Sequence, residues 1–297
     1  MSLKFELELG SKASRIDDAL NDYLPPIKLY PPLIHESMRY SVVFGGKRLR
    51  PVMLMAAAES VGEKTDKILP AACAVEVLHN YSLVHDDLPA MDNDDYRRGR
   101  PTSHKMYGEA TAILTGDALL TFSFQLLVHC AQLGVDSQST LRAVDILARA
   151  AGSMGLIGGQ LVDTLSEKDN IDYDTLKYIH LHKTACLFRA SMEIGAVLSG
   201  AEEDDLHALG CYGENFGLAF QIIDDILDLE GDVAKTGKPT GSDLKNRKAT
   251  YPLLFGVEES RAKARDAIME AIDSISYLGD KINFLRHLAY YVLSRDR

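Results

Sequence analysis

Residues 67–92 read KILPAACAVEVLHNYSLVHDDLPAMD. From Leu69 to Val84 this stretch is apolar on almost every side of a helix, with apolar residues repeated at three- and four-residue spacing. Such a helix is typical of the centre of a bundle, where neighbouring helices cover all of its faces. The stretch ends in carboxylates, so the sequence predicts a buried helix that delivers an acidic cluster.

Other segments repeat this apolar spacing. They cover residues 33–44, 50–61, 109–133, 138–156, 174–200, 203–229 and 249–273, with 67–88 as the quoted example. Glycines that favour helix ends lie between them, at Gly45, Gly46, Gly62, Gly134, Gly200 and Gly231. Strand-like alternation is scarce, and no Pro/Ser-rich linker divides the chain. The pattern predicts an all-α fold in which residues 1–297 form a single-domain bundle of long helices.

The composition narrows the classes of function. A net charge of −11 over 297 residues argues against nucleic acid as a partner, because such a surface needs a basic field. No uninterrupted apolar run approaches the roughly 18 residues that span a bilayer, so we expect no stable membrane insertion. Charge in the first ten residues leaves no signal-peptide core. The four cysteines include no CxxC pair, as expected in a reducing compartment, and we expect a cytoplasmic protein.

A second acidic cluster lies at residues 221–228, QIIDDILD. Helical spacing places Gln221, Asp224 and Asp228 on one stripe, while the intervening isoleucines point into packing. Unpaired carboxylates buried in this way would cost several kcal/mol each. A cation is therefore expected beside them, and oxygen ligands suit Mg²⁺.

The first cluster predicts the same chemistry. Asp86 shares a helical stripe with Ser82 and His79. Pro89 cannot continue the helix, so the chain should turn there and bring Asp92 back as a further ligand. One DDxxD-like pair alone is more often a solvated helix end. Two such pairs on apolar helices make that alternative the weaker one.

Several cations accompany the acidic clusters. Residues 45–51, GGKRLRP, bring Lys47, Arg48 and Arg50 to a helix start, where they are expected to seat a diphosphate. The adjacent Arg97 and Arg98 must point in different directions. The remaining candidates are Lys183 with Thr184 inside an apolar helix, and Lys238 and Lys248 in or beside a Gly/Pro loop at 231–243 that could close over a substrate. Taken singly, each of these lysines is more often a surface residue than a ligand.

These motifs together resemble the trans-prenyl diphosphate synthases, and the bacterial farnesyl type most of all. The residues that carry the resemblance are GGKRLRP, LVHDDLPAMDNDDYRRGRPTSH, GGQLVD at 158–163, HKTACLF, FQIIDDILD and GKPTGSDLKNRKATYP. The resemblance extends from about residue 30 to the C-terminus. It implies one polyprenyl synthase domain of isoprenoid synthase type, with helices around a deep central cavity, and a homodimer.

The resemblance also implies a role for each motif residue. Mg²⁺, as three ions per site, is implied to bind Asp86, Asp92 and Asp224, with Asp87, Asp225 and Asp228 as auxiliary carboxylates whose direct ligation stays open. The allylic diphosphate is implied to bind Arg97, Lys183, Thr184, Gln221, Lys238 and Lys248. Isopentenyl diphosphate is implied to bind Lys47, Arg50, His79 and Arg98. The residues closest to the chemistry are implied to be Lys183, Thr184 and Gln221, with Thr184 and Gln221 shielding the carbocation.

The length of the product is expected to depend on the depth below Asp86. Ser82 lies one helical turn down, and Tyr81 lies five residues or about 7.5 Å down, where it is bulky enough to form a floor. An ordinary core tyrosine is equally compatible with the periodicity. An aromatic residue here, with the expanded DDLPAMD motif, resembles a producer of C15 farnesyl diphosphate. A C20 geranylgeranyl product is the main alternative.

Other classes fit the motifs less well. A terpene cyclase would not need GGKRLRP, and a non-catalytic subunit of a heteromeric synthase would be expected to lack aspartates in one motif. A purely structural bundle explains none of the cations. The terminal Arg295 and Arg297 either reach the site or are solvated, and we expect them to be solvated.

Overall fold

The computed structural model describes residues 3–62, 66–166, 172–230 and 250–295. Lys238, Lys248 and Arg297, for which functions or positions are predicted above, lie outside the described residues. Within the described ranges nearly all regular structure is helical, which confirms the all-α prediction.

The helices follow one another with short connections. In the first half they are α1 (Leu3–Tyr23), α2 (Pro32–Val43), α3 (Leu49–Ser60), α4 (Leu69–Asp86), α5 (Ser103–Tyr107), α6 (Glu109–Gln132) and α7 (Ser137–Ala151). In the second half they are α8 (Leu156–Ser166), α9 (Tyr173–Ile179), a π-helical turn (His180–Ala185), α10 (Cys186–Leu198), α11 (Glu203–Glu230), α14 (Tyr251–Phe255), α15 (Val257–Ser274), a 3₁₀ segment (Ser276–Ile282) and α16 (Asn283–Leu293).

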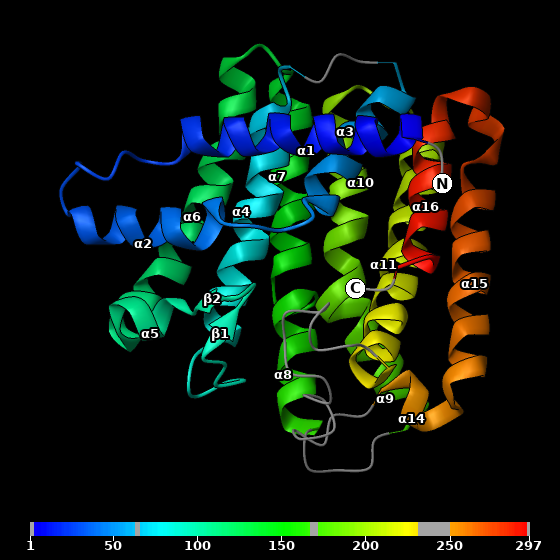
Figure 1. Cartoon of the computed structure of the whole chain (residues 1–297). Coiled ribbons are helices and arrows are strands. Elements are labelled where there is room, and N and C mark those ends of the chain that lie inside the picture. The colour runs from blue at the N-terminus through cyan, green and yellow to red at the C-terminus, as the bar shows by residue number, and fades with distance from the viewer. Residues whose placement is uncertain (1–2, 63–65, 167–171, 231–249, 296–297) are drawn as a thin grey trace.

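The long helices form a bundle that α1 crosses at one end (Figure 1). α4 packs along α6, while α10 lies between α3, α7 and α11, and α15 covers the outer side of α11. α3, α4 and α10 are buried along most of their length, as the quoted stretch predicts for α4. The centre of the bundle therefore consists of helices that are apolar nearly all round.

A short antiparallel hairpin follows the first acidic cluster. Strand β1 (Tyr96–Arg97) pairs with β2 (Arg100–Pro101), with Arg97 opposite Arg100. The turn residues Arg98 and Gly99 have φ of 53° and 74°, the left-handed pair that two-residue hairpin turns use. This turn separates the directions of Arg97 and Arg98, as predicted.

The length and apolar composition of α6 bear on the expectation that the chain does not insert into a membrane. Among the described residues it is the one helix long and apolar enough to cross a bilayer by length and composition. Long core helices of globular proteins meet the same criterion, and α6 packs against α2, α4, α5 and α7. Ile113, Leu114 and Val128 on this helix remain exposed.

Several helix ends also differ from the prediction. The expected helix at 138–156 ends at Ala151, and the one at 174–200 is divided by the π-helical turn. α1 was not predicted, because its buried positions are sparse and its surface is charged. α16 was missed although Leu285, Leu288, Ala289 and Val292 are buried at regular helical spacing.

Candidate active site

The first acidic motif forms a closed turn at the end of α4. The helix ends at Asp86, and after Pro89 the chain returns so that the Asp92 N–H donates to the Asp86 carbonyl at 2.9 Å. The predicted return of Asp92 is confirmed. Both carboxylates are half-buried at the end of a buried helix, where they can present oxygen ligands together.

The next residue, Asp87, points into the protein. It is buried and accepts two hydrogen bonds from Arg97 Nε, at 2.7 and 2.9 Å, while Arg97 Nη2 lies 2.6 Å from Oδ1. Burial alone would lower the pKa of Arg97, but the hydrogen bond and charge of Asp87 outweigh it and the pKa is raised. Arg97, predicted to bind the allylic diphosphate, is thus engaged by Asp87 in this structure.

The second acidic motif lies in α11, close to cations from other helices. Burial raises the pKa of the Asp224 carboxyl, while the charges of Arg295, Lys47 and Arg50 act in the opposite direction. Asp228 follows one turn later on the same helix. Asp224 is therefore subject to the positive charge of Lys47 and Arg50 from the GGKRLRP motif, and it pairs directly with Arg295.

The prediction that Arg295 is solvated is wrong. Its side chain is 7% exposed, and Nη1 lies 2.8 Å from Asp224 Oδ1. Its guanidinium also stacks on Phe220, with 4.4 Å between the guanidinium carbon and the ring centroid. Arg295 follows α16 and contacts two residues of α11, so tertiary packing rather than the local sequence decides where this arginine lies.

Asp225 is buried and organises its neighbours. It accepts hydrogen bonds from Gln221 Nε2 at 3.0 Å and from the Tyr251 N–H at 3.1 Å, and His180 Nε2 lies 3.4 Å away. Burial lowers the pKa of His180 to about 3. Gln221 Oε1 in turn accepts from Thr184 Oγ1 at 2.8 Å. This chain of bonds fixes the orientation of both residues predicted to shield a carbocation.

The π-helical turn places Lys183 and Thr184. A π turn widens one turn of a helix and is frequent at functional sites. Here it lies against α8, so closely that a Cβ on Gly159 would be 2.3 Å from Lys183 N. Lys183 Nζ donates to Asp163 Oδ2 at 2.6 Å. Asp163 had no assigned role in the sequence, although it closes the GGQLVD motif quoted above.

The predicted isopentenyl diphosphate residues form a cationic group around a neutral histidine. Desolvation, followed by the charges of Arg50, Arg98 and other arginines, lowers the pKa of His79 well below its ordinary value. Burial also lowers the pKa of Arg50 to about 10, and its guanidinium lies 4.1 Å from the Phe188 ring centroid. Arg50 Nε has no hydrogen-bond partner among the described residues. A cationic group of this kind is suited to a phosphate ligand.

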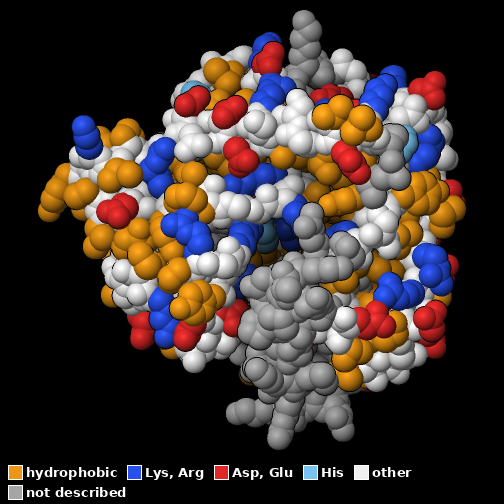
Figure 2. Space-filling view, viewed as in Figure 1, with side chains coloured by type: hydrophobic (Ala, Val, Ile, Leu, Met, Phe, Trp, Pro, Cys, Tyr) orange, Lys and Arg blue, Asp and Glu red, His pale blue; other side chains and the backbone are white. Residues whose placement is uncertain are grey.

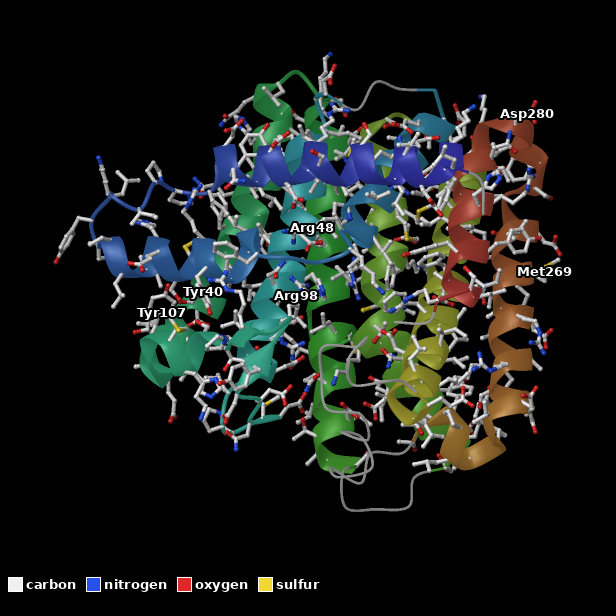
Figure 3. All side chains as sticks on the ribbon, in the orientation of Figure 1. Tyr40, Arg48, Arg98, Tyr107, Met269 and Asp280 are labelled. Atoms are coloured by element: carbon white, nitrogen blue, oxygen red, sulfur yellow. The ribbon has the colours of Figure 1, made fainter. Side chains whose placement is uncertain are left out.

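Arg48 does not belong to this group. Its side chain is buried and turned away from Lys47 and Arg50, toward Glu76 and Asp17. The prediction that all three cations of GGKRLRP seat a phosphate is therefore wrong for Arg48. Arg48 is buried beside α4, whereas Arg98 is exposed in the hairpin turn on the other side of the Gly45 loop (Figure 3).

The expected floor residues lie on α4 inside the bundle. Tyr81 is 4% exposed, its hydroxyl has no hydrogen-bond partner among the described residues, and its ring meets His85 edge-on at 5.7 Å. Burial, and then the charge of Asp86, raise the pKa of Tyr81 to about 12. Ser82 is buried and donates to the His79 carbonyl at 2.9 Å. A buried tyrosine whose hydroxyl makes no hydrogen bond within the described part of the chain contributes bulk at this position.

The donor set fits Mg²⁺. In the described ranges no three His, Cys, Asp or Glu side chains gather tightly enough to hold an ion alone. Asp86 at the end of α4, Asp92 in the turn that follows and Asp224 on α11 instead supply oxygen donors from separate elements, the arrangement that suits an ion completing its shell with water and phosphate. Figure 2 shows a hollow on the face beside the grey atoms, with Lys and Arg side chains on its rim.

Comparison with known proteins agrees with this geometry. A family model described as polyprenyl synthetase matches residues 31–283. The chain is 41% identical over 296 residues to farnesyl diphosphate synthase of Bacillus subtilis (strain 168), covering 100% of both chains. It is 44% identical over 282 residues to geranylgeranyl diphosphate synthase of Cyanophora paradoxa, covering 95% of this chain and 93% of that protein.

A solved structure supports the same assignment. The geranyltransferase of Helicobacter pylori, described as complexed with magnesium and isoprenyl diphosphate, superposes with a TM-score of 0.85. It is 31% identical in sequence, and the match covers 99% of this chain and 97% of that chain. The chain therefore belongs to the polyprenyl synthetase family of prenyltransferases.

Proposed function

We propose that the protein is a Mg²⁺-dependent farnesyl diphosphate synthase, which condenses isopentenyl diphosphate with dimethylallyl or geranyl diphosphate. The observation that carries the proposal is the position of Asp224, a half-buried carboxylate subject to the charges of Lys47 and Arg50. Acidic and cationic groups in one cleft suit a substrate that carries a diphosphate and arrives with metal ions.

The residues divide between two diphosphates. Arg50, His79 and Arg98, with Lys47, hold isopentenyl diphosphate through charge-assisted hydrogen bonds. The allylic diphosphate is bound by Arg97, Lys183, Lys238 and Lys248. Three Mg²⁺ ions, held by Asp86, Asp92 and Asp224, supply positive charge that stabilises the departing diphosphate.

The polar atoms of Thr184 and Gln221 shield the allylic cation. Their mutual hydrogen bond and the bond from Gln221 to Asp225 hold these dipoles in place before the reaction, so little reorganisation is required. The isopentenyl double bond attacks C1 of the allylic cation, and the departing diphosphate accepts the proton that is lost. Exclusion of water protects the cation during these steps.

A C15 product is favoured by Tyr81. Its bulk lies five residues below Asp86, and its buried hydroxyl makes no hydrogen bond among the described residues. The relatives named above include a farnesyl and a geranylgeranyl synthase, so a C20 product is the second candidate.

A homodimer in the cytoplasm completes the proposal. The exposed apolar residues Ile113, Leu114 and Val128 lie on α6, a helix that a second copy of the chain would cover. Burial of this face between two copies also accounts for its apolar composition without a membrane.

The test is product analysis. Purified protein is incubated with Mg²⁺, labelled isopentenyl diphosphate and either dimethylallyl or geranyl diphosphate, and the dephosphorylated products are sized by chromatography. We expect a dominant C15 alcohol. A C20 or longer product would retain the enzyme class and reject Tyr81 as the floor, and no elongation would reject catalysis in favour of a non-catalytic subunit.

A further inference from the structure

The middle cation of GGKRLRP occupies an unusual backbone position. Arg48 has φ 51° and ψ 28°, in the left-handed region, where it caps the start of α3. Gly45 and Gly46 just before it have φ of 82° and 120°. A non-glycine residue in this conformation costs about 1 kcal/mol or more and persists only where its surroundings determine it.

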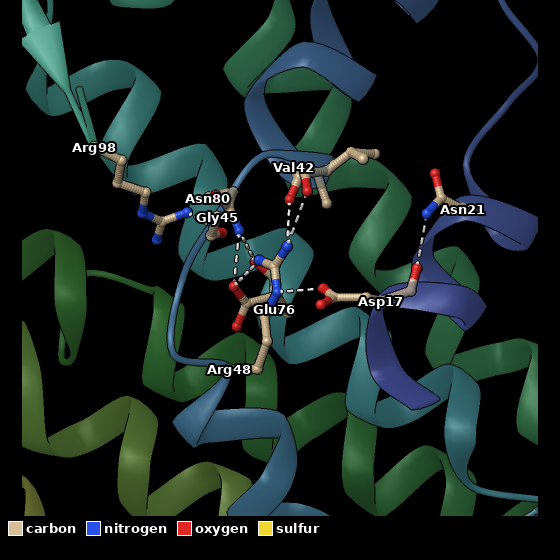
Figure 4. A network of polar contacts seen from close by, with 9 residues as sticks. Asp17, Asn21, Val42, Gly45, Arg48, Glu76, Asn80 and Arg98 are labelled. Carbon is tan, nitrogen blue, oxygen red and sulfur yellow. Dashed lines mark hydrogen bonds and ion pairs between the residues drawn. The ribbon is translucent and has the colours of Figure 1, made fainter. Parts of the chain in front are cut away.

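Those surroundings are a buried polar network around the Arg48 guanidinium (Figure 4). Nη1 donates to Glu76 Oε1 at 2.6 Å, Nε donates to Asp17 Oδ1 at 2.8 Å, and Nη2 donates to the Val42 carbonyl at 2.8 Å. Arg48 is 3% exposed and Glu76 is 2% exposed. The Arg48 guanidinium and the Glu76 carboxylate each need the other, because either charge left unpaired at this depth would be strongly unfavourable.

The network joins four helices beside the proposed isopentenyl diphosphate site, since Val42 belongs to α2. Asp17 belongs to α1, Arg48 starts α3, and Glu76 lies on α4 three residues before His79. One side chain therefore sets the separation between the start of α3, which carries Arg50, and the face of α4 that carries His79.

Arg98 holds the same loop from the other side. Its Nη1 donates to the Gly45 carbonyl at 2.7 Å, and a Cβ added to Gly46 would lie 3.1 Å from its guanidinium carbon. The peptide at Gly45 and Gly46 is thus confined between two arginines, one buried behind it and one on the side of the cleft.

We propose that Arg48 is a positioning residue for isopentenyl diphosphate: it does not contact the substrate but fixes Lys47 and Arg50 against His79. This inference rests on the proposed function, since it concerns the same site. Arg48→Lys keeps the charge that Glu76 requires, but a single ammonium cannot reach Glu76, Asp17 and Val42 together. The loop should then lose its fixed position while the buried charge stays paired.

The test compares ligand binding with stability in matched variants. Arg48→Lys is compared with Arg39→Lys, because Arg39 also ties α1 down, through the carbonyls of Asn21 and Leu24, without touching the loop. For Arg48→Lys we expect KM and the calorimetric Kd of isopentenyl diphosphate to rise about tenfold, or about 1.4 kcal/mol. KM for geranyl diphosphate and kcat should stay within about twofold, and Arg39→Lys should change neither KM.

A second variant covers the case in which Arg48→Lys does not fold. Asp17→Asn removes the charge of the outer contact and leaves the pair with Glu76, so it should shift KM for isopentenyl diphosphate in the same direction by about threefold. Unchanged binding in both variants would overturn the proposal, as would an equal weakening of both substrates with a loss of Tm matching Arg39→Lys.

Failure of the proposed function would be seen separately. If the wild type does not elongate, that function is rejected, while calorimetry with inorganic diphosphate still decides the role of Arg48. Equal Kd for diphosphate in wild type and Arg48→Lys would then reject the positioning role.

Discussion

The acidic motif at the end of α4 and the one in α11 each place two adjacent aspartates on a largely buried helix. In both, the first carboxylate is half-buried and the second is buried among protein partners. The partners differ. Asp87 is bound by the charged Arg97, whereas Asp225 is bound by a side-chain amide and a backbone N–H beside a histidine.

The difference shows how a helix can hold two carboxylates for one ligand. Only one member of each pair needs to face the cleft, and the other anchors the surrounding structure. At the first motif it anchors the hairpin that carries Arg97, and at the second it anchors Gln221 and the start of α14. Substitutions at matched positions should therefore have different consequences.

The largest difference is expected in stability. Asp87→Asn removes the closest counter-ion of the Arg97 guanidinium, leaving Asp94 Oδ2 at 3.7 Å, and should lower the free energy of unfolding by about 3 kcal/mol. Asp225→Asn weakens hydrogen bonds to neutral donors and should cost about 1 kcal/mol. Urea unfolding of both variants measures the difference, and equal losses would contradict the distinction between the two anchors.

A buried histidine that is neutral in the folded protein accompanies each motif. His79 lies on α4 before the first motif, and His180 lies in the π-helical turn beside Asp225 of the second. Desolvation lowers the pKa of His79 well below its ordinary value, and burial lowers that of His180 from 6.5 to about 3. The unfolded chain binds these protons near pH 6.5 and the folded chain does not, so the stability present above pH 6.5 is lost as pH falls below it. The loss should approach about 1.4 kcal/mol per pH unit for each histidine.

Urea unfolding at pH 7.5, 6.5 and 5.5 checks this dependence. His180→Gln should reduce the slope below pH 6.5 by about half, since it removes one of the two titrations. A free energy of unfolding that is constant over this range would show that neither histidine is held neutral.

The next contrast lies five residues before the first aspartate of each pair, where α4 carries Tyr81 and α11 carries Ala219. Only the first motif has a bulky residue at this distance. Tyr81→Ala should open the cavity and shift the main product from C15 to C20 or longer, measured by chromatography of the alcohols. Tyr81→Phe is the control, because the hydroxyl has no partner among the described residues, and it should keep a C15 product. A C15 product from Tyr81→Ala would show that a residue other than Tyr81 limits the length of the product.

The smallest effect is expected at Arg295, which pairs with Asp224 of the second motif. Its ion pair with Asp224 competes with Mg²⁺ for the carboxylate. Arg295→Gln should therefore lower the Mg²⁺ concentration for half-maximal activity by about fivefold, a partly buried ion pair being worth about 1 kcal/mol. Arg286→Gln, a change at a half-buried arginine of α16 that donates a hydrogen bond to Asn283, should have no effect, and a higher Mg²⁺ requirement in Arg295→Gln would contradict the competition.

Local rules allowed the sequence to predict the bundle and the acidic turn. Helical periodicity predicted α4 and α11 with their carboxylates, and the inability of Pro89 to continue a helix predicted the return of Asp92, which the bond to the Asp86 carbonyl confirms. Charged clusters on apolar helices were a sufficient signal, because burial without partners is unfavourable.

Long-range partners could not be predicted in this way. The direction of Arg48 depends on Glu76 and Asp17 from two other helices. The burial of Arg295 depends on packing of the chain end against α11. The division of 174–200 by a π-helical turn has no counterpart in apolar periodicity, which continues through it. Such features are decided by tertiary contacts between residues distant in sequence.

The most direct test of the account is the Mg²⁺ dependence of elongation in wild type, Asp86→Asn and Asp224→Asn, with isopentenyl and geranyl diphosphates as substrates. The account predicts no elongation by the wild type after chelation of Mg²⁺, and a kcat at least about a hundredfold lower in each variant, with Tm unchanged. Wild-type kcat in either variant, or elongation that persists without a divalent ion, would contradict the assignment of the two motifs to one metal-diphosphate site.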